Sequence, residues 1–497
     1  MYFLGLDIGT SSIKASVVDA NTQQVIASTS FPEVEVEISS LHDGWAEQDP
    51  ELWWKNTQGA ILKLNATKLF NPKEIAAIGI SYQMHGLVMV DKQKEVLRPS
   101  IIWCDSRAVE IGEKAFEAIG ENYCLPCLLN SPGNFTASKL AWVKENEPEV
   151  FEKCHKIMLP GDFIAMKLTN EITTTFTGLS EGVFWDFKEN KLSEKVLDYF
   201  GFTTAIFPEI QSSFSNHGGL SLEIAETLGL SPNTPVTYKA GDQPNNALSL
   251  DVLEPGEIAA TAGTSGVIYA VSDQVSYDAK SRINSFAHVN HLANDQNRIG
   301  ILLCINGTGI LNRWVKDNFG ANLSYSEMNK LAAEVAIGSN GVVVLPFGNG
   351  AERIFENKIL GSHIGNLNFN KHSRNHIFRA AQEGIACSFK YGFDIMQANG
   401  LEPKVIKAGN ANMFLSDIFK QTLSNITDRP IELYDTDGAK GAALGAGHGY
   451  GFYSTLKEAF VNLKKIETIV PNLSEKEKSF DTYQTWVAYL TDFFAKS

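Results

Sequence analysis

Residues 9 to 19 read Gly-Thr-Ser-Ser-Ile-Lys-Ala-Ser-Val-Val-Asp, and residues 263 to 273 read Gly-Thr-Ser-Gly-Val-Ile-Tyr-Ala-Val-Ser-Asp. Five positions are identical, and the copies lie 254 residues apart, about half of the 497-residue chain. Each copy predicts a strand, a tight Gly-Thr-Ser turn and a second strand. Such a turn can present N–H groups and hydroxyls to a phosphate. The repeat therefore predicts two related domains that hold one nucleotide between them. The alternative is two unrelated hairpins with similar turn chemistry.

Length and composition fit a globular protein of two large domains. The chain is 44% hydrophobic and 20% charged, with a formal net charge of −15. This charge argues against nucleic acid or an anionic membrane as a partner, because both need a basic surface. It does not exclude ATP, because a local pocket and a magnesium ion can outweigh the overall field.

The lack of a recognisable targeting signal and the scattered cysteines predict a cytoplasmic protein. No apolar run reaches membrane-spanning length. The first residues predict a strand rather than a signal peptide, because a basic segment is missing and Asp7 interrupts the apolar run. The six cysteines are scattered, and the Cys124/Cys127 pair lacks a thioredoxin-like context, so we expect no redox or metal role there. The sequence does not decide the oligomeric state, and a homodimer is the alternative to a monomer.

Apolar runs and turn residues predict an α/β fold. A helix is expected to start at Asp49-Pro50, since Asp suits the N-cap and Pro the first helical position. We expect strands at 3–9, 13–18, 24–31, 75–81 and 236–240 in the first half. In the second half we expect a hairpin at 258–271, helices within 308–337, a strand at 342–346, a helix at about 373–399 and a strand at 404–408. The tail after about residue 455 is expected to be helical. Residues 251–256 form the connection, so the expected domains are 1–250 and 251–497.

Several segments occur in an order that points to one protein family. They are Asp7-Ile-Gly-Thr-Ser-Ser-Ile-Lys14, Trp45-Ala-Glu-Gln-Asp-Pro50, Gln83-Met-His-Gly86, residues 97–107, Gly241-Asp242-Gln243 and residues 261–266. Each segment alone is a weak signal, but their order and spacing are specific. Together they resemble the FGGY carbohydrate kinases, within the actin-like ATPase superfamily, over roughly residues 2–450. By motif the chain is closest to the xylulokinases of that family.

The resemblance implies two actin-like (ribonuclease H-like) domains, each on a mixed five-stranded sheet, with a cleft between them. The first is then the sugar-binding and catalytic domain, and the second is the nucleotide-binding domain. The implied reaction is ATP-dependent phosphorylation of a ketopentose, with D-xylulose converted to D-xylulose 5-phosphate. ATP is the implied co-substrate and Mg²⁺ the implied metal.

Asp242 is the expected general base. It follows a predicted strand and precedes a predicted helix start. A carboxylate within hydrogen-bond reach of a sugar hydroxyl can take its proton as the new P–O bond forms. The alternative is an aspartate that only caps the helix. A helix N-terminus should lower its pKa, which a loose transition state tolerates because the proton can move late.

Asp7 is expected at the end of the first strand, beside the turn of residues 9–12 (the first turn). A carboxylate there can hold magnesium through water, whereas the alternative is an aspartate that stabilises the turn. The resemblance assigns Asp7 and Asp242 together as catalytic residues and as metal ligands. Lys14 either reaches toward the transferred group or lies on an exposed strand face.

The sugar is expected at two segments, residues 83–86 and 97–107, which we call the sugar-side segments. The resemblance implies a pocket made by Met84, His85, Trp103, Asp105, Arg107, Asp242 and Gln243. Arg107 could equally be a surface ion-pair residue. Glycerol kinases carry an Arg-Glu pair in place of Met84-His85, which argues against glycerol. Residues 103–107 also depart from the Trp-Asn-Asp-Gly-Arg usual in xylulokinases.

The nucleotide is expected at both turns and at two further segments. The resemblance implies contacts from Thr10, Ser11, Lys14, Gly263, Thr264, Ser265, Gly309, Gly409, Asn410 and Asn412. In the family's Gly-rich adenosine turn this chain keeps only Gly409, so its nucleotide preference is open. Gly438 and Gly441 predict tight helix packing, which is as readily structural as functional.

Two alternatives to a D-xylulose kinase stay open. Within the class, the substrate could be another sugar or polyol, such as ribulose, fuculose or glycerol. From another class, the chain could be a non-catalytic nucleotide-gated protein, like the filament or chaperone members of the superfamily. The sugar-side segments favour an enzyme.

Overall fold

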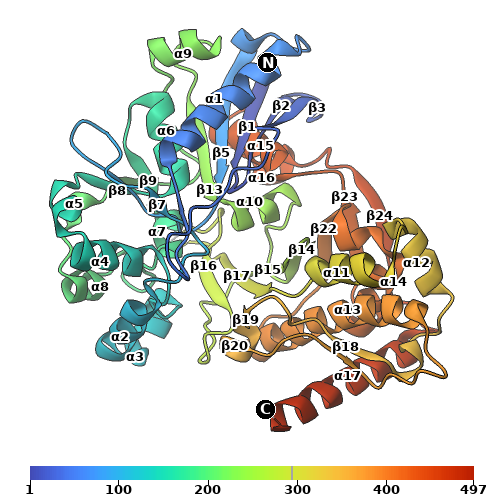
Figure 1. The fold of residues 1–497 in the computed structure, drawn as a ribbon. Coiled ribbons are helices and arrows are strands. Elements are labelled where there is room, and N and C mark those ends of the chain that lie inside the picture. The colour runs from blue at the N-terminus through green and yellow to red at the C-terminus, as the bar shows by residue number, and fades with distance from the viewer. Residues whose placement is uncertain (293–294, 497) are drawn as a thin grey trace.

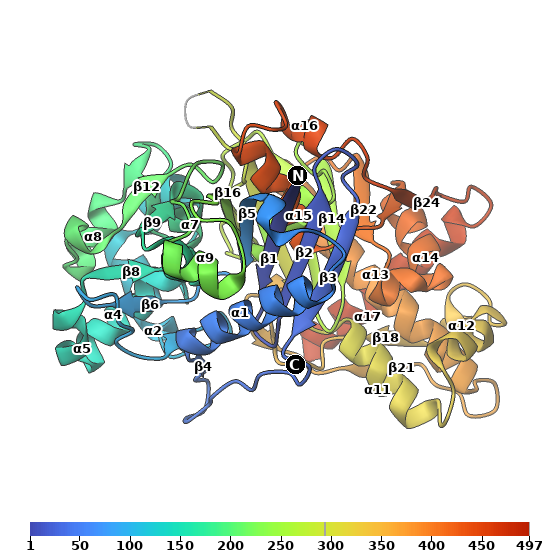
Figure 2. The same ribbon diagram turned by 90° about the horizontal axis from the view of Figure 1, so that it is seen from above.

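The computed structural model describes residues 1–292 and 295–496, and it contains the two related halves that the repeat predicts (Figure 1). The blue-to-green half and the yellow-to-red half lie side by side, in this view and in the view from above (Figure 2). Each half is built on one large β-sheet. The predicted α/β class is therefore confirmed.

The first sheet contains the five strands that the sequence predicts. They are β1 (Tyr2–Ile8), β2 (Ile13–Asp19), β3 (Val25–Phe31), β5 (Ile75–Tyr82) and β13 (Val236–Gly241). Their order is β13-β5-β1-β2-β3, with β1 antiparallel to β2 and parallel to β5. The parallel strands β5 and β13 end at the same edge, so the residues that follow them lie together.

The second sheet has seven strands rather than the expected five. They are β14 (Glu257–Ala262), β15 (Gly266–Ser272), β16 (Asn284–Ala287), β17 (Ile299–Ile305), β22 (Val405–Gly409), β23 (Ile431–Tyr434) and β24 (Lys465–Ile469). The order is β16-β17-β15-β14-β22-β23-β24. The five inner strands repeat the first sheet, with β14 antiparallel to β15 and parallel to β22.

The two additional strands lie at the edges of the second sheet. Strand β16 has only four residues, and four of the five residues of β24 are exposed. Neither strand therefore carries the apolar pattern by which a buried strand is recognised. The tail was expected to be helical, which is wrong for β24 and right for α16 (Leu456–Ala459) and α17 (Lys476–Lys496).

Two helices lie between the sheets, α10 (Asp242–Ser249) and α15 (Gly438–Gly449). Helix α15 belongs to the second half but packs on β1, β5 and β2, and its red ribbon lies among the blue strands (Figure 1). Two strand glycines allow this approach: a Cβ on Gly5 would lie 1.8 Å from the Ala439 oxygen, and one on Gly79 would lie 2.0 Å from the Ala442 oxygen. The predicted tight packing at Gly441 is confirmed, since a Cβ there would lie 2.5 Å from the Ser249 Cβ. The domain boundary near residue 250 stays a prediction.

The predicted helix starts and spans agree with the structure. Helix α1 (Pro50–Ala66) begins at Pro50, and the Asp49 side chain accepts a hydrogen bond from the Glu51 N–H. The other expected elements are β18 (Val343–Leu345), α11 (Gly309–Phe319), α12 (Tyr325–Ala333) and α13 (Arg374–Ala398).

The segment between β5 and β13 carries most of the smaller elements. Its helices are α2 (Val109–Ile119), α3 (Glu121–Tyr123), α4 (Thr136–Asn146), α5 (Pro148–Lys153), α6 (Pro160–Thr169), α7 (Phe176–Glu181), α8 (Glu194–Phe200) and α9 (Leu222–Leu228). The short strands of the first half are β4 (Glu47–Gln48), β6 (Val88–Val90), β7 (Ser100–Ile101), β8 (Lys156–Met158), β9 (Thr173–Thr175), β10 (Trp185–Asp186), β11 (Lys191–Leu192) and β12 (Glu209–Gln211). The second half adds α14 (Asp417–Thr427), β19 (Ala351–Glu352), β20 (Lys358–Ile359) and β21 (His363–Gly365). Among the described helices, none is both long and apolar enough to cross a membrane.

Candidate active site

Asp7 lies near the end of β1, where its carboxylate meets the start of α15. The Ser81 hydroxyl donates a 2.8 Å hydrogen bond to one carboxylate oxygen. A Cβ on Gly438 would lie 2.6 Å from the other oxygen, so only glycine fits there without displacing Asp7. Burial raises the pKa of Asp7, and the charge of Asp437 adds to the rise, against the Ser81 hydrogen bond and the charge of Lys14. Lys14 is exposed and stands directly opposite Asp7 in the strand register, hence on the same face of the sheet.

Asp242 is the first residue of α10. Burial raises its pKa to about 7, the charge of Asp7 adds to the rise, and hydrogen bonds from Gln243 oppose it. The expected lowering by the helix N-terminus is therefore outweighed. Asp7 of β1 and Ala240 of β13 pair with Ser81 of β5 from its two sides, so the carboxylates of Asp7 and Asp242 stand at one edge of the sheet and belong to one site.

This pair of carboxylates suits a hydrated magnesium ion. Neither Asp7 nor Asp242 has a cationic side chain within 4.0 Å among the described residues. The negative charges of Asp7 and Asp242 repel each other, so a cation bound between them is favourable. Magnesium prefers carboxylate and water oxygens as ligands. Within the described part of the chain, no group of three or more His, Cys, Asp or Glu side chains could form a metal cage. The donor set therefore fits an ion that keeps most of its water and binds through one or two carboxylates.

The first turn is tied to the sugar-side segments by Thr10. Its hydroxyl donates to the Gln83 Oε1 at 3.1 Å and accepts from the Trp103 Nε1 at 3.0 Å. Its carbonyl accepts from the Gln48 Nε2 at 2.7 Å. The structure thus brings Gln83, Trp103 and Thr10 together and adds Gln48, which the sequence did not single out. Ser11 lies in the same turn, and its carbonyl accepts from the Val36 N–H at 2.8 Å.

His85 has one ring nitrogen without a hydrogen-bond partner among the described residues. Its Nδ1 lies 3.0 Å from the Glu181 carbonyl oxygen, so Nδ1 carries the hydrogen. Burial, followed by the charge of Lys139, lowers its pKa to about 3, so the ring is neutral and Nε2 is an acceptor. Its backbone has φ of +62°, an unusual conformation that often marks a functional position. The ring of Phe286, from the second half, lies 5.5 Å from the His85 ring.

Lys139 of α4 joins the two sugar-side segments, although the sequence did not single it out. Its ammonium donates to the His85 carbonyl at 3.0 Å and to the Ile102 carbonyl at 2.9 Å. The side chain is fully buried, and burial lowers its pKa to about 7. A buried amine with two carbonyl partners fixes the positions of both loops.

Met84 and Glu181 lie against the strand end that carries Asp242. A Cβ on Gly241 would lie 2.7 Å from the Met84 Cγ and 2.7 Å from the Glu181 Oε2. The other oxygen of Glu181 accepts a 2.8 Å hydrogen bond from the Tyr82 hydroxyl. The structure thus brings Met84, His85 and Asp242 together, with Glu181 as a further member that the sequence did not reveal.

Asp105 and Arg107 form a buried ion pair rather than the surface pair considered from the sequence. Their side chains are 0% and 1% exposed, and the nitrogen–oxygen distance is 2.7 Å. Arg107 also pairs with Glu47 at 2.7 Å and lies over the Trp45 ring at 3.7 Å. These contacts occupy both side chains, so we interpret them as supports for the loop of Trp103, which is 53% exposed beside the first turn.

The second turn, residues 263–265, meets the first residues of α11. The Gly309 N–H donates to the Gly263 oxygen at 2.8 Å, and the Ile310 N–H donates to the Thr264 oxygen at 3.1 Å. A Cβ on Gly309 would lie 2.3 Å from the Gly263 oxygen, so only glycine can stand at position 309 this close to the turn. A turn beside a helix N-terminus favours a phosphate.

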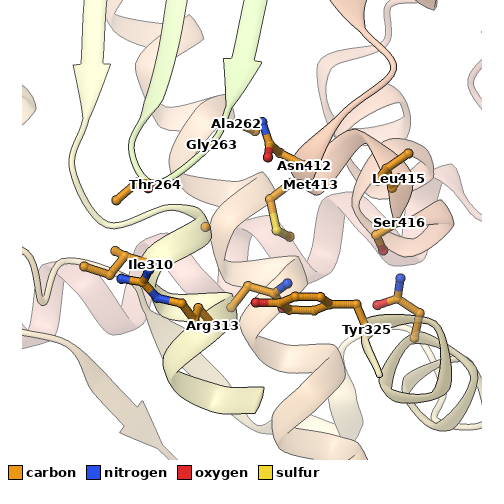
Figure 3. A pocket seen from close by; sticks show the side chains of 13 residues that line it. Ala262, Gly263, Thr264, Ile310, Arg313, Tyr325, Asn412, Met413, Leu415 and Ser416 are labelled. Carbon is orange, nitrogen blue, oxygen red and sulfur yellow. The ribbon is translucent and has the colours of Figure 1, made fainter. Parts of the chain in front are cut away.

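A cavity of about 330 Å³ opens beside this turn (Figure 3). It is lined by Ala262, Gly263, Thr264, Gly309, Ile310, Asn312, Arg313, Tyr325, Asn329, Asn412, Met413, Leu415 and Ser416. In Figure 3, Tyr325 of α12 faces Met413 across the cavity. Of the predicted adenosine residues, Asn412 lines this cavity, whereas Gly409 and Asn410 stand at the end of β22 outside the lining set.

Sequence reasoning missed most of the wall opposite the turn. Residues 412–415 form a short 3₁₀ helix, for which the sequence has no periodic signal. The start of α12 could have been found, because Ser324 and Glu327 form a capping box.

Comparison with known proteins gives one family for both halves. The model described as the FGGY family of carbohydrate kinases, N-terminal domain, matches residues 2–249, and the corresponding C-terminal domain model matches residues 258–449.

Related proteins and a solved structure match this chain over nearly its full length. A xylulose kinase of Lactococcus lactis is 29% identical, covering 98% of this chain and 95% of that protein. A xylulose kinase of Escherichia coli is 27% identical, and the match covers 98% of this chain and 96% of that protein. The crystal structure of a protein named as a xyloylose kinase from Brucella ovis has a TM-score of 0.88 at 25% identity and covers 100% of both chains.

Proposed function

The chain belongs to the FGGY family of carbohydrate kinases, and from this membership we propose that it transfers the γ-phosphoryl group of ATP to the terminal hydroxyl of D-xylulose. The observation that carries the proposal is the position of Asp242. Its carboxylate stands with Asp7 at one strand edge, beside Met84. The first turn joins that edge to the sugar-side segments through Thr10.

The mechanism follows from the residues at this edge. Asp242 accepts the hydrogen of the sugar hydroxyl while that oxygen attacks the γ-phosphorus and the bond to ADP breaks. The N–H groups and hydroxyls of the two turns orient the phosphates. A magnesium ion, when bound, neutralises phosphate charge, and Asp7 with Asp242 would hold it. Closure of the two halves would exclude water, so that the sugar hydroxyl reacts in its place.

Sugar recognition rests on Met84 and His85. The neutral imidazole offers Nε2 as an acceptor for a sugar hydroxyl, while Met84 packs against the carbon skeleton. Relatives named as xylulose kinases match nearly the whole chain, which supports D-xylulose as the substrate. Free thiols at all six cysteines and the use of ATP fit a cytoplasmic enzyme.

A panel of ketoses tests the proposal. Release of ADP is measured with D-xylulose, D-ribulose and L-fuculose at equal concentration, with glycerol as the polyol control. We expect the highest kcat/KM with D-xylulose. A higher value with another sugar would reassign the substrate, and an ADP release that no sugar stimulates would favour a nucleotide-gated protein without kinase activity.

Lys139→Met is expected to weaken sugar binding selectively. Loss of the two carbonyl contacts frees the loops of His85 and Ile102, and each such hydrogen bond contributes about 0.5–1.5 kcal/mol even when the amine is neutral. We expect KM for the sugar to rise about tenfold or more while KM for ATP stays within about twofold. Lys144→Met is the matched control, because Lys144 also lies on α4 and donates to two carbonyls, those of Phe200 and Gly201. Equal effects of both variants on sugar KM would contradict the assignment.

Asp7→Asn is expected to raise the Mg²⁺ concentration required for turnover. The amide keeps the Ser81 contact but removes one of the two charges that attract the ion. We expect the half-maximal concentration to rise about tenfold, as measured by titration of Mg²⁺ at saturating substrates. Asp19→Asn, at the far end of the paired strand β2, should leave the titration unchanged.

The pKa of Asp242, about 7, predicts that kcat/KM depends on pH and is lower in acid. The base must be unprotonated, so kcat/KM is expected to fall as pH drops through about 7 at limiting Mg²⁺. A bound cation favours the carboxylate form, so saturating Mg²⁺ should move this fall to lower pH. A profile that is flat between pH 5 and pH 8 at limiting Mg²⁺ would contradict the role of Asp242.

A further inference from the structure

Arg353 is a partly buried cation that has no anionic partner among the described residues. It follows β19 and starts a short 3₁₀ helix that packs against β17. Its Nη1 donates to the Asn284 Oδ1. Within residues 1–292 and 295–496, no carboxylate lies within 4.0 Å of its guanidinium. Burial lowers its pKa, which reflects the cost of a charge removed from water.

Contacts on β16 link Arg353 to the sugar-side segments. Asn284 and Phe286 are two residues apart on β16 and therefore lie on the same face of the strand. Phe286 contacts the His85 ring at 5.5 Å. The charge of Arg353 also contributes to lowering the pKa of His85. Arg353 of the second half is thus linked through Asn284 and Phe286 of β16 to the sugar-side segment of the first half. Strands β16, β17 and β19 lie beside that half (Figure 1).

The backbone before Arg353 is fixed on the segment that leads toward the second turn. Glu352, which precedes it, accepts from the N–H groups of Asn306 and Gly307 at 3.0 Å each. These bonds fix the segment that leads into Gly309, which itself bonds to Gly263. Both oxygens of Glu352 are thereby occupied, so this carboxylate is not a partner for Arg353.

Cys304 provides a second link between the arginine and the turn. Cys304 lies on β17, which pairs with β15 directly after the second turn. Burial raises the pKa of its thiol to about 11, and the charge of Arg353 opposes this rise. The short helix that Arg353 starts thus packs on β17, whose partner β15 follows the second turn. Its hydrogen-bond partner Asn284 lies on β16 with Phe286, which contacts the His85 ring.

We propose that Arg353 binds the phosphoryl group as it passes from ATP to the sugar and then binds the phosphate of the sugar phosphate product. The inference rests on the proposed kinase reaction. A guanidinium donates to two phosphate oxygens at once and stays charged. It forms no covalent bond: the bond from phosphorus to ADP breaks, the bond to the sugar oxygen forms, and the proton goes to Asp242. The missing counter-ion in the free protein is then supplied by the substrate.

Arg353→Gln tests the proposal through binding and turnover. Affinities for D-xylulose and for D-xylulose 5-phosphate are measured by calorimetry in the presence of ADP, together with kcat. We expect kcat to fall about 100-fold or more and the affinity for the sugar phosphate to fall at least about tenfold, with the affinity for the free sugar unchanged. Arg353→Lys, which keeps the charge without the planar fork, should recover part of both losses.

Lys358→Gln is the matched control, because it removes one positive charge from the same segment at an exposed position of β20. It should leave both affinities unchanged. Thermal unfolding of Arg353→Gln should keep its midpoint, because the lost charge had no ionic partner. Equal loss of affinity for the free sugar and its phosphate, or no loss for either, would overturn the role of Arg353. If the wild type binds neither xylulose compound, the proposed sugar is wrong, and the same comparison is made with the ketose selected by the panel.

Discussion

Asp242→Asn is expected to lower kcat about 1000-fold while the protein stays folded and binds ATP. The amide has nearly the shape of the carboxylate but cannot take a proton from the sugar hydroxyl. General-base catalysis contributes about 10²–10⁴-fold, and the middle of that range sets the expected loss. The change also removes the charge that acts together with Asp7, so the affinity for MgATP is to be measured separately from turnover.

The measurement is single-turnover transfer from ATP to D-xylulose, with ATP binding followed by calorimetry. Asp251→Asn is the control, because Asp251 follows α10 at the opposite end and has φ of +52°, which asparagine tolerates. The control should keep kcat within about twofold. Near-normal transfer by Asp242→Asn would remove this residue from the mechanism.

Gly5→Val is expected to destabilise the protein more than any surface substitution. The Cβ atom alone would lie 1.8 Å from the Ala439 oxygen and 2.6 Å from the Ala443 nitrogen. These are backbone atoms of α15, which cannot move as a side chain does. Overpacking typically costs about 1–3 kcal/mol and occasionally more, and here we expect at least about 3 kcal/mol. The same shift of α15 displaces Gly438 from Asp7, so the folded fraction should also lose activity.

The free energy of unfolding, from denaturant titration, checks this prediction. Ser30→Val is the control, since it adds a β-branched side chain at an exposed position of the same sheet. Its free energy of unfolding should change by no more than about 0.5 kcal/mol. A similar small change for Gly5→Val would mean that α15 does not pack on β1 as closely as described.

The inner parts of both sheets could be predicted, because their strands are buried and their turns repeat. The Gly-Thr-Ser turns located β1 with β2 and β14 with β15, and Asp49-Pro50 located the start of α1. The expected packing at Gly441 also agrees with the structure. These features are local in sequence, so a short window carries the whole signal.

The parts that could not be predicted depend on contacts between distant segments. Lys139 lies 54 residues from His85 and 37 from Ile102, and nothing in its helix marks it as their partner. Glu181 and Arg353 are equally unmarked. The pKa of Asp242 was expected to be lowered by the helix N-terminus, but burial and Asp7 raise it, and burial is a property of the whole fold rather than of the local sequence.

A crystal structure of Asp242→Asn with a non-hydrolysable ATP analogue, Mg²⁺ and D-xylulose tests the central claim most directly. We expect the adenine in the cavity beside Tyr325 and Met413, and the γ-phosphate between Thr10 and Thr264. The terminal hydroxyl of the sugar should lie within about 3 Å of the residue-242 side chain. A triphosphate that contacts only one of the two turns, or a sugar bound away from residue 242, would contradict the account.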